Sequence, residues 1–271
     1  MSHSKGIYSY VKKLVSRKAL ANQSTPEQAH HTFAQQVINL EPFFCNQSHT
    51  FQGVICKDLL THYSANPSMH FKECLNNLAF WHCHGRAIHT LIPMRVDTLL
   101  DPQQTHLLKS CLVESYLPVG LISIPLSGIT TSSLNNVEST LQQFIRLGVK
   151  FEIYDFSGTK EEFHCLESPF FKGVHFSLTL IRAASQTSYS SEIFQKVLSA
   201  SLQKKFHTYS GGISLVHDFN FARKNLIEFC YGPLLMPAVT KYQILRIKDS
   251  LIASMHKLTT PSTKMKDGEI L

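Results

Sequence analysis

From residue 32 onward, short apolar stretches with strand character alternate with amphipathic stretches of helical period. The pattern predicts strands at 33–40, 51–56, 87–96, 119–126, 149–155, 173–178 and 207–216, and a short extended piece at 232–237. It predicts helices at 68–83, 102–116, 132–147, 190–205, 221–229 and 239–255. Asp101 before Pro102 is typical of a helix start, and Gly148 is typical of a helix end. Strands separated by helices predict parallel β/α architecture, and roughly eight strands in about 230 residues favour a (β/α)8 barrel.

The segments outside this alternation are basic or polar. Residues 6–20 predict a short amphipathic helix, and residues 21–31 predict a polar linker. Together, 1–31 are predicted to be an N-terminal helical extension, 32–256 a single barrel domain and 257–271 a flexible tail. The helix is predicted to pack on the domain; the alternative is that it docks on a protein partner or a membrane surface.

Composition narrows the class of protein. The chain has no apolar run long enough to span a bilayer and no signal-peptide core at its N-terminus, which predicts a cytoplasmic protein. Its seven cysteines are an odd number and form no CxxC pair, which favours buried free thiols over disulfides. The net charge is +7, but the body of the chain shows no concentrated basic stripe, which argues against nucleic acid as a partner.

The strand predicted at 149–155 ends in an acidic residue. The apolar run 149–153 leads into Tyr154 and Asp155, and a turn with Gly158 follows. Barrel enzymes place their sites at the C-terminal ends of the strands, so Asp155 is a candidate site residue. An alternative is structural: the carboxylate caps the next helix or pairs with a base such as Arg95 or His175.

Several segments resemble the EAL domain, the barrel of bacterial cyclic-di-GMP phosphodiesterases. Phe144-Ile-Arg-Leu-Gly148 followed by Val149-Lys-Phe-Glu-Ile-Tyr-Asp-Phe-Ser-Gly158 resembles the family's L-x-x-L-G helix and DDFG motif. Gly173-Val-His-Phe-Ser-Leu178 resembles the K-I-D strand, and Tyr231-Gly-Pro-Leu-Leu-Met-Pro237 resembles the closing QGY…P segment. The resemblance implies an EAL-type (β/α)8 TIM-like barrel across residues 32–250.

The resemblance also implies lost chemistry. Active members bind two divalent cations through Glu, Asn and Asp side chains at the barrel mouth, and such cations need several converging oxygen ligands. Asp155 is the one acid that the matching positions of this chain retain. The implied motif positions are Ile55, Arg95, Pro125, Tyr154, Asp155, His175, His217 and Tyr231. The sequence therefore predicts a degenerate EAL domain that is not an enzyme and holds no cofactor.

Three hypotheses for function follow. The first is a regulator that acts through contacts with a protein partner in a bacterial signalling pathway. The second is a cyclic-di-GMP receptor that does not hydrolyse its ligand, with Arg95 at a phosphate and Tyr154 or Tyr231 stacked on guanine. The third is a divergent enzyme with another substrate, for which the sequence points to no site; Asp155, His175 and His217 within hydrogen-bond reach of each other would support it.

A histidine-rich stretch is the remaining candidate for chemistry. His82-Cys83-His84 and His89 form the densest group of metal-capable side chains in the sequence. No second cysteine pair or carboxylate accompanies them, so chance clustering is favoured over a zinc site.

Overall fold

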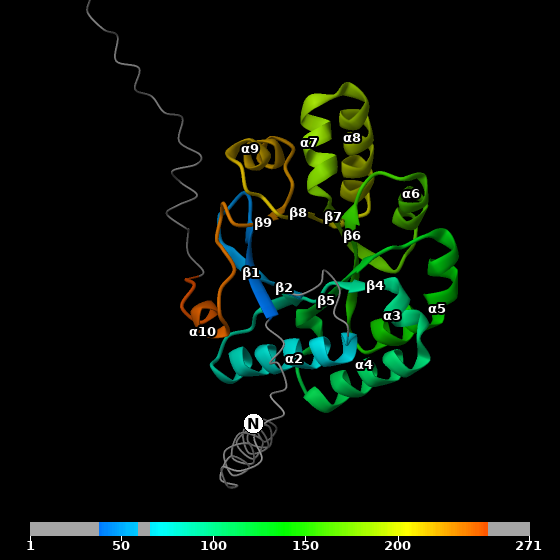
Figure 1. Ribbon diagram of the computed structural model, residues 1–271, viewed down its shortest axis with the longest axis vertical. Coiled ribbons are helices and arrows are strands. Elements are labelled where there is room, and N and C mark those ends of the chain that lie inside the picture. The colour runs from blue at the N-terminus through cyan, green and yellow to red at the C-terminus, as the bar shows by residue number, and fades with distance from the viewer. Residues whose placement is uncertain (1–37, 59–65, 249–271) are drawn as a thin grey trace, which may run out of the picture. The chain divides into compact units, whose positions relative to one another are not determined.

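The computed structural model describes residues 38–58 and 66–248, and these form a β-barrel surrounded by helices (Figure 1). The predictions for 6–20, 21–31 and the tail from 257 lie outside the described residues, as do most of the strand predicted at 33–40 and the end of the helix predicted at 239–255. Within the described part of the chain, no helix is long and apolar enough to cross a membrane.

In the described residues, nine strands form one sheet that closes on itself. The sheet order is β3-β2-β1-β9-β8-β7-β6-β5-β4, and an additional pairing of β3 with β5 joins the ends. Because β3 and β4 are successive pieces that both pair with β5, the ring has eight positions, and the predicted barrel is confirmed. The strands are β1 Ile38–Cys45, β2 Phe51–Asp58, β3 His89–Leu91, β4 Met94–Arg95, β5 Ile122–Ser127, β6 Lys150–Phe156, β7 Phe171–Phe176, β8 His207–Ser210 and β9 Phe229–Tyr231.

The direction of β1 corrects the prediction of a wholly parallel barrel. β1 pairs antiparallel with both β2 and β9, whereas the other pairings are parallel. The physical reason is the connection: β1 and β2 are joined by a short turn, and a parallel neighbour would need a crossover of a dozen or more residues. The start of β1 therefore lies at the same barrel end as the C-terminal ends of the other strands.

The helices lie outside the strands, as Figure 1 shows. Four predicted helices are confirmed within one or two residues, at α2, α4, α5 and α8, and the Asp101 carboxylate accepts hydrogen bonds from the backbone amides of Gln103 and Gln104. Gly148 follows α5 with φ +101°, a conformation that suits glycine. The helices are α2 Pro67–Cys83, α3 Val96–Leu100, α4 Pro102–Ser115, α5 Thr131–Arg146, α6 Lys160–Leu166, α7 Leu178–Gln186, α8 Ser188–Gln203, α9 Val216–Lys224 and α10 Lys241–Ile244, with a 3-10 turn at Val119–Leu121.

The C-terminal third departs most from the predicted elements. The strand predicted at 207–216 ends at Ser210, because the glycine pair Gly211–Gly212 turns the chain out of the sheet. The helix predicted at 221–229 is instead α9, which ends at Lys224, and its last predicted residue begins β9. The piece predicted as extended at 232–237 forms turns, and the short helices α6 and α7 were not assigned from the pattern.

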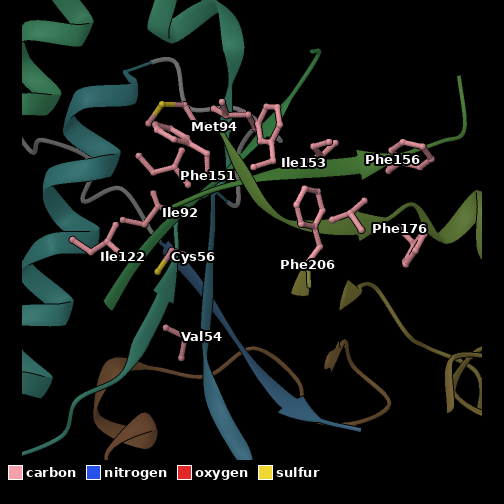
Figure 2. Close-up of a cluster of buried hydrophobic side chains, with 14 of the residues drawn as sticks. Val54, Cys56, Ile92, Met94, Ile122, Phe151, Ile153, Phe156, Phe176 and Phe206 are labelled. Carbon is pink, nitrogen blue, oxygen red and sulfur yellow. The ribbon is translucent and has the colours of Figure 1, made fainter. Parts of the chain in front are cut away.

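Alternating strand residues face two different interiors. Side chains such as Phe151, Ile153 and Phe176 point outward and pack under the helices, where they form the outer core (Figure 2). Their neighbours along the same strands point into the barrel. This second interior, the lumen, contains the apolar cluster Phe43, Ile55, Leu91, Tyr209, Phe229 and Tyr231.

Candidate functional site

The mouth of the barrel is formed by the C-terminal ends of the parallel strands and by the start of β1. Lys57 lies next to the last residue of β2, and its Nζ lies 2.8 Å from Glu41 Oε2 on β1. The same Nζ lies 5.0 Å from the centroid of the Tyr231 ring. Tyr231 is the last residue of β9 and is only 2% exposed. An ion pair and an aromatic ring therefore cover this part of the mouth.

Asp155 occupies an irregular end of β6. The register with β7 shifts between Ile153 and Phe156, and Asp155 has φ 60°, in the left-handed region. Asp155 is exposed, while Phe156 returns to the outer core. Sequence analysis singled out this residue correctly as a strand-end acid.

The structure tests the proposed structural roles of Asp155. The next helix, α6, is capped by the Thr159 side chain, and the Glu162 carboxylate accepts from the backbone amides of residues 157–159. Helix capping by Asp155 is therefore wrong. Both ring nitrogens of His175 contact other residues, Tyr231 at Nδ1 and Glu152 at Nε2. The Arg95 guanidinium donates from both Nε and Nη2 to a single oxygen, Oδ2, of Asp97.

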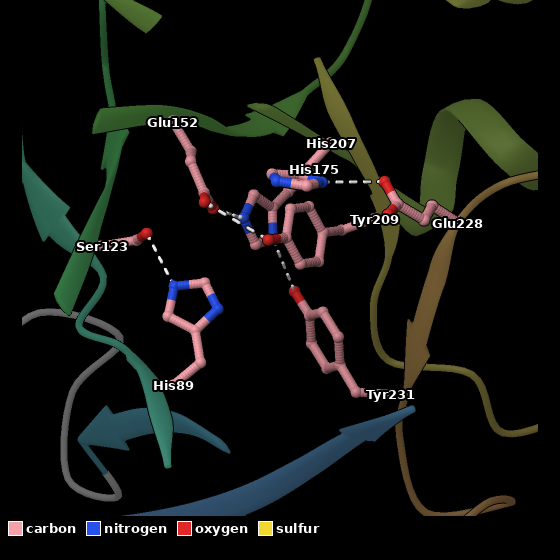
Figure 3. Close-up of polar contacts among 8 residues, drawn as sticks. All are labelled: His89, Ser123, Glu152, His175, His207, Tyr209, Glu228 and Tyr231. Atoms are coloured by element: carbon pink, nitrogen blue, oxygen red, sulfur yellow. Dashed lines mark hydrogen bonds and ion pairs between the residues drawn. The ribbon is translucent and has the colours of Figure 1, made fainter. Parts of the chain in front are cut away.

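A polar network that the sequence analysis missed lies inside the lumen (Figure 3). Glu152 of β6 and His175 of β7 are 0% and 1% exposed, and His175 Nε2 lies 2.6 Å from Glu152 Oε2. The Tyr209 hydroxyl donates to Glu152 Oε1 at 3.3 Å, and the Tyr231 hydroxyl lies 3.4 Å from His175 Nδ1. The His175 ring stacks on the Tyr209 ring with centroids 4.1 Å apart. Four side chains from four strands thus form one connected cluster.

The charge of Glu152 is maintained by its neighbours. Burial alone would raise the pKa of Glu152, but the hydrogen bond and charge of His175 outweigh burial and the pKa is lowered. Burial raises the pKa of both Tyr209 and Tyr231 well above the usual tyrosine range. Glu152 is therefore a carboxylate at neutral pH, and the two phenols remain protonated and act as donors.

Two further histidines lie near the cluster. His89 Nε2 lies 2.9 Å from the Ser123 hydroxyl, and burial lowers the pKa of His89 to about 4. His207 Nδ1 lies 2.9 Å from Glu228 Oε2, and this hydrogen bond raises the pKa of His207. His89 is therefore neutral at pH 7, and Glu152 carries a buried charge in this region.

Apolar side chains fill the lumen around these groups. Phe43, Ile55, Leu91 and Tyr209 are each 0% exposed. Pro125 is also buried, between outer-core residues Ile124 and Leu126 of β5. The barrel interior is thus packed with side chains, and Tyr231 is buried at its mouth.

The predicted site residues divide into three groups. Tyr154 and Tyr231 come together with His175, since the Tyr154 and His175 ring centroids are 5.3 Å apart. Asp155 and Arg95 lie at the exposed rim. His217 is exposed in the first turn of α9 and lies on no strand, so it does not join His175 in the lumen as a divergent enzyme site would require.

Glu152 could have been found from the sequence. Phe151 and Ile153 are alternate apolar residues of one strand, so the intervening carboxylate must face the other interior. In a barrel that interior is the lumen, and a lone buried carboxylate requires a partner. The alternation thus predicts a paired Glu152, although it does not identify His175 as the partner.

The donor set does not fit two divalent cations. Glu41 is paired with Lys57 and Asp97 with Arg95, while Ile55 and Pro125 offer no side-chain oxygen. Over residues 38–58 and 66–248, no group of three His, Cys, Asp or Glu side chains could hold a metal ion. The histidine-rich stretch at 82–89 forms no such group either, because His84 contacts the Phe80 carbonyl whereas His89 lies in the lumen.

Solved structures share this barrel. The EAL domain of Mycobacterium smegmatis DcpA is 12% identical, with a TM-score of 0.67 over 78% of this chain and 94% of that domain. The chain has the fold of an EAL domain. The PaMucR phosphodiesterase in its c-di-GMP complex is 14% identical, with a TM-score of 0.66 over 78% of this chain and 94% of that one.

A third solved structure shares the same fold. The FimX EAL domain of Xanthomonas citri, in complex with c-di-GMP, is 12% identical, with a TM-score of 0.64 over 89% of this chain and 97% of that domain. No family model matches the sequence, and no curated protein matches it. The likeness is therefore one of fold, and it confirms the EAL-type barrel expected from the sequence.

Proposed function

We propose that this EAL-fold protein is a catalytically inactive regulator that acts through contacts with a protein partner in a bacterial signalling pathway, in the cytoplasm. The observation that carries the proposal is the packed lumen. Tyr231 at the end of β9 and Ile55 within β2 are buried where a phosphodiester and its metal ions would need an open site lined by oxygen ligands. The charges nearest the mouth neutralise each other in pairs, Glu41 with Lys57 and Arg95 with Asp97.

A barrel without a catalytic site can still bind other proteins through its surface. The outer core is continuous and apolar, so the barrel presents its helices as a rigid surface. A rigid surface that has lost its reaction retains the ability to bind another protein, and this supports the regulator over the divergent enzyme.

A hydrolysis assay tests the inactivity. We expect purified protein to produce no linear dinucleotide from cyclic-di-GMP in the presence of Mg²⁺ or Mn²⁺, with an active EAL phosphodiesterase run in parallel. Metal-dependent turnover that survives repurification and is lost in Asp155→Asn would overturn the proposal. Affinity capture from the native host, followed by reconstitution with purified components, tests the partner. A protein that is monomeric and captures nothing reproducible would contradict the regulatory role.

The alternative is a receptor that binds cyclic-di-GMP without hydrolysis. Two observations favour testing it: the Arg95 side chain is 46% exposed at the rim, and structures with the same fold hold c-di-GMP. Titration calorimetry separates the two functions. Heat of binding that disappears in Arg95→Ala supports the receptor, whereas the regulator predicts no heat at high micromolar protein.

A further inference from the structure

Tyr231 is held from three sides at the mouth of the barrel. Its hydroxyl lies 3.4 Å from His175 Nδ1 inside the lumen, and Lys57 Nζ lies 5.0 Å from its ring centroid on the other side. The ring also packs on the backbone of Gly211, where an added Cβ would lie 2.2 Å from Tyr231 Cζ. Any larger residue at 211 would displace the ring. Glycine at position 211 therefore leaves the space that the Tyr231 ring occupies.

His175, which holds the Tyr231 hydroxyl, is itself fixed in place. Its Nε2 donates to the Glu152 carboxylate, because an ionised carboxylate only accepts hydrogen bonds. Its ring stacks on Tyr209 with an interplanar angle of 2°. The second ring nitrogen, Nδ1, faces the Tyr231 hydroxyl at 3.4 Å, and Tyr231 also forms a hydrogen bond with Tyr154. The contacts therefore form a chain in which Glu152 positions His175 and His175 contacts Tyr231.

We infer that Tyr231 is a latch that closes the mouth of the barrel, and that the buried pair of Glu152 and His175 holds it closed. Rotation of the phenol away from His175 would open a path from the rim to the imidazole and the Tyr209 ring. A partner or ligand reaches the lumen only after this movement. The inference rests on the contacts of Tyr231 and stands whether or not the protein hydrolyses a nucleotide.

Hydroxyl-radical footprinting with mass spectrometry tests the latch, because it reports the solvent exposure of individual tyrosines. Tyr189 is 73% exposed and serves as the open reference, while Tyr209 is 0% exposed and reports loss of the whole fold. In the native protein we expect Tyr231 to react as slowly as Tyr209. A Tyr231 that reacts as fast as Tyr189 would overturn the inference without any variant.

The double variant Glu152→Gln with His175→Phe removes the support and leaves no buried charge. We expect the reactivity of Tyr231 to rise about ten-fold, the factor that corresponds to one lost hydrogen bond, while Tyr209 stays protected. Unchanged protection of Tyr231 in this folded variant would show that His175 does not hold it.

A measurement on the native protein covers the case in which the variant does not fold. The latch predicts that the Tyr231 hydroxyl proton exchanges slowly with water and shows a through-space NMR contact to the His175 ring. Rapid exchange of this proton in the native protein would also overturn the inference.

Discussion

The outer core and the lumen are built from the same strands but obey different rules. Phe151 and Ile153 of β6 face the helices among apolar side chains, whereas Glu152 between them faces the lumen and binds His175. The outer core is stabilised by area removed from water and tolerates many apolar solutions. The lumen contains a charge that is stable only with a specific partner. The barrel could therefore keep its fold through the outer core while the lumen diverged to a particular network.

The largest expected effect lies in the outer core. Phe151→Ala removes a fully buried ring and leaves a cavity, so we expect the free energy of unfolding to fall by about 4 kcal/mol. Urea denaturation followed by circular dichroism measures this. Leu202→Ala on the exposed face of α8 is the matched control, with an expected change below about 0.5 kcal/mol. A loss at Phe151 no greater than at Leu202 would mean that the outer core is not the main source of stability.

Breaking the lumen pair tests the other half of the comparison. Glu152→Leu leaves His175 buried without its partner, and we expect a loss of about 3 kcal/mol. Adding His175→Leu removes the second half of the pair, and we expect most of that loss to be recovered, because an apolar pair needs no charge compensation. Denaturant midpoints of the single and double variants give the coupling. If the two losses simply add, the pair is not a unit and the contrast with the outer core fails.

Lowering the pH distinguishes the lumen from the outer core, because protonation affects the buried polar groups of the lumen and not apolar contacts. Burial lowers the pKa of His89 to about 4, below the unfolded value of 6.5. Between these values the unfolded chain binds the proton that the folded chain excludes, so stability is complete above pH 6.5 and is lost as the pH falls. The contribution of His89 amounts to at most about 3 kcal/mol.

Chemical denaturation of the native protein and of His89→Gln across this pH range isolates the effect. We expect the difference in stability between the two to change steadily between pH 6.5 and 4, in the direction that favours the variant at low pH. A difference that is independent of pH would show that His89 is protonated or accessible in the folded protein. Glu152 adds its own loss only at lower pH, because its folded pKa lies below the usual carboxylate value.

The outer core also explains which parts of the fold the sequence could predict. Apolar residues at period two and helical periods gave the strands from 51 to 178 and the long helices α2, α4 and α5, because burial on the helix side imposes that periodicity. The antiparallel β1 was not predicted, since its direction depends on a short turn and on closure with β9. The end of β8 at Ser210 was missed because apolar residues continue past it.

For the site, the sequence predicted where the acid Asp155 would lie and which motif positions would carry no carboxylate. It could not predict the contacts inside the lumen. Glu152, His175, Tyr209 and Tyr231 are separated by many residues, and only the pairing of strands β6, β7, β8 and β9 in the curved sheet brings their polar atoms together. Pairings of this kind are long-range, and no local period encodes them. The role of each predicted motif position in binding stays a prediction.

The smallest expected effect lies at the rim, where a charge pair resembles the lumen pair in geometry but not in surroundings. Lys57 and Glu41 are 2.8 Å apart, with side chains 26% and 15% exposed, so water screens part of their attraction. We expect Lys57→Met to cost less than about 1 kcal/mol, because a pair that water still reaches contributes little and the Met side chain still covers the Tyr231 ring. Thermal denaturation at low and high salt measures it, and the difference between native protein and variant should shrink as salt rises. A loss as large as that of Glu152→Leu, insensitive to salt, would mean that burial does not distinguish the two pairs and that the rim belongs energetically to the lumen.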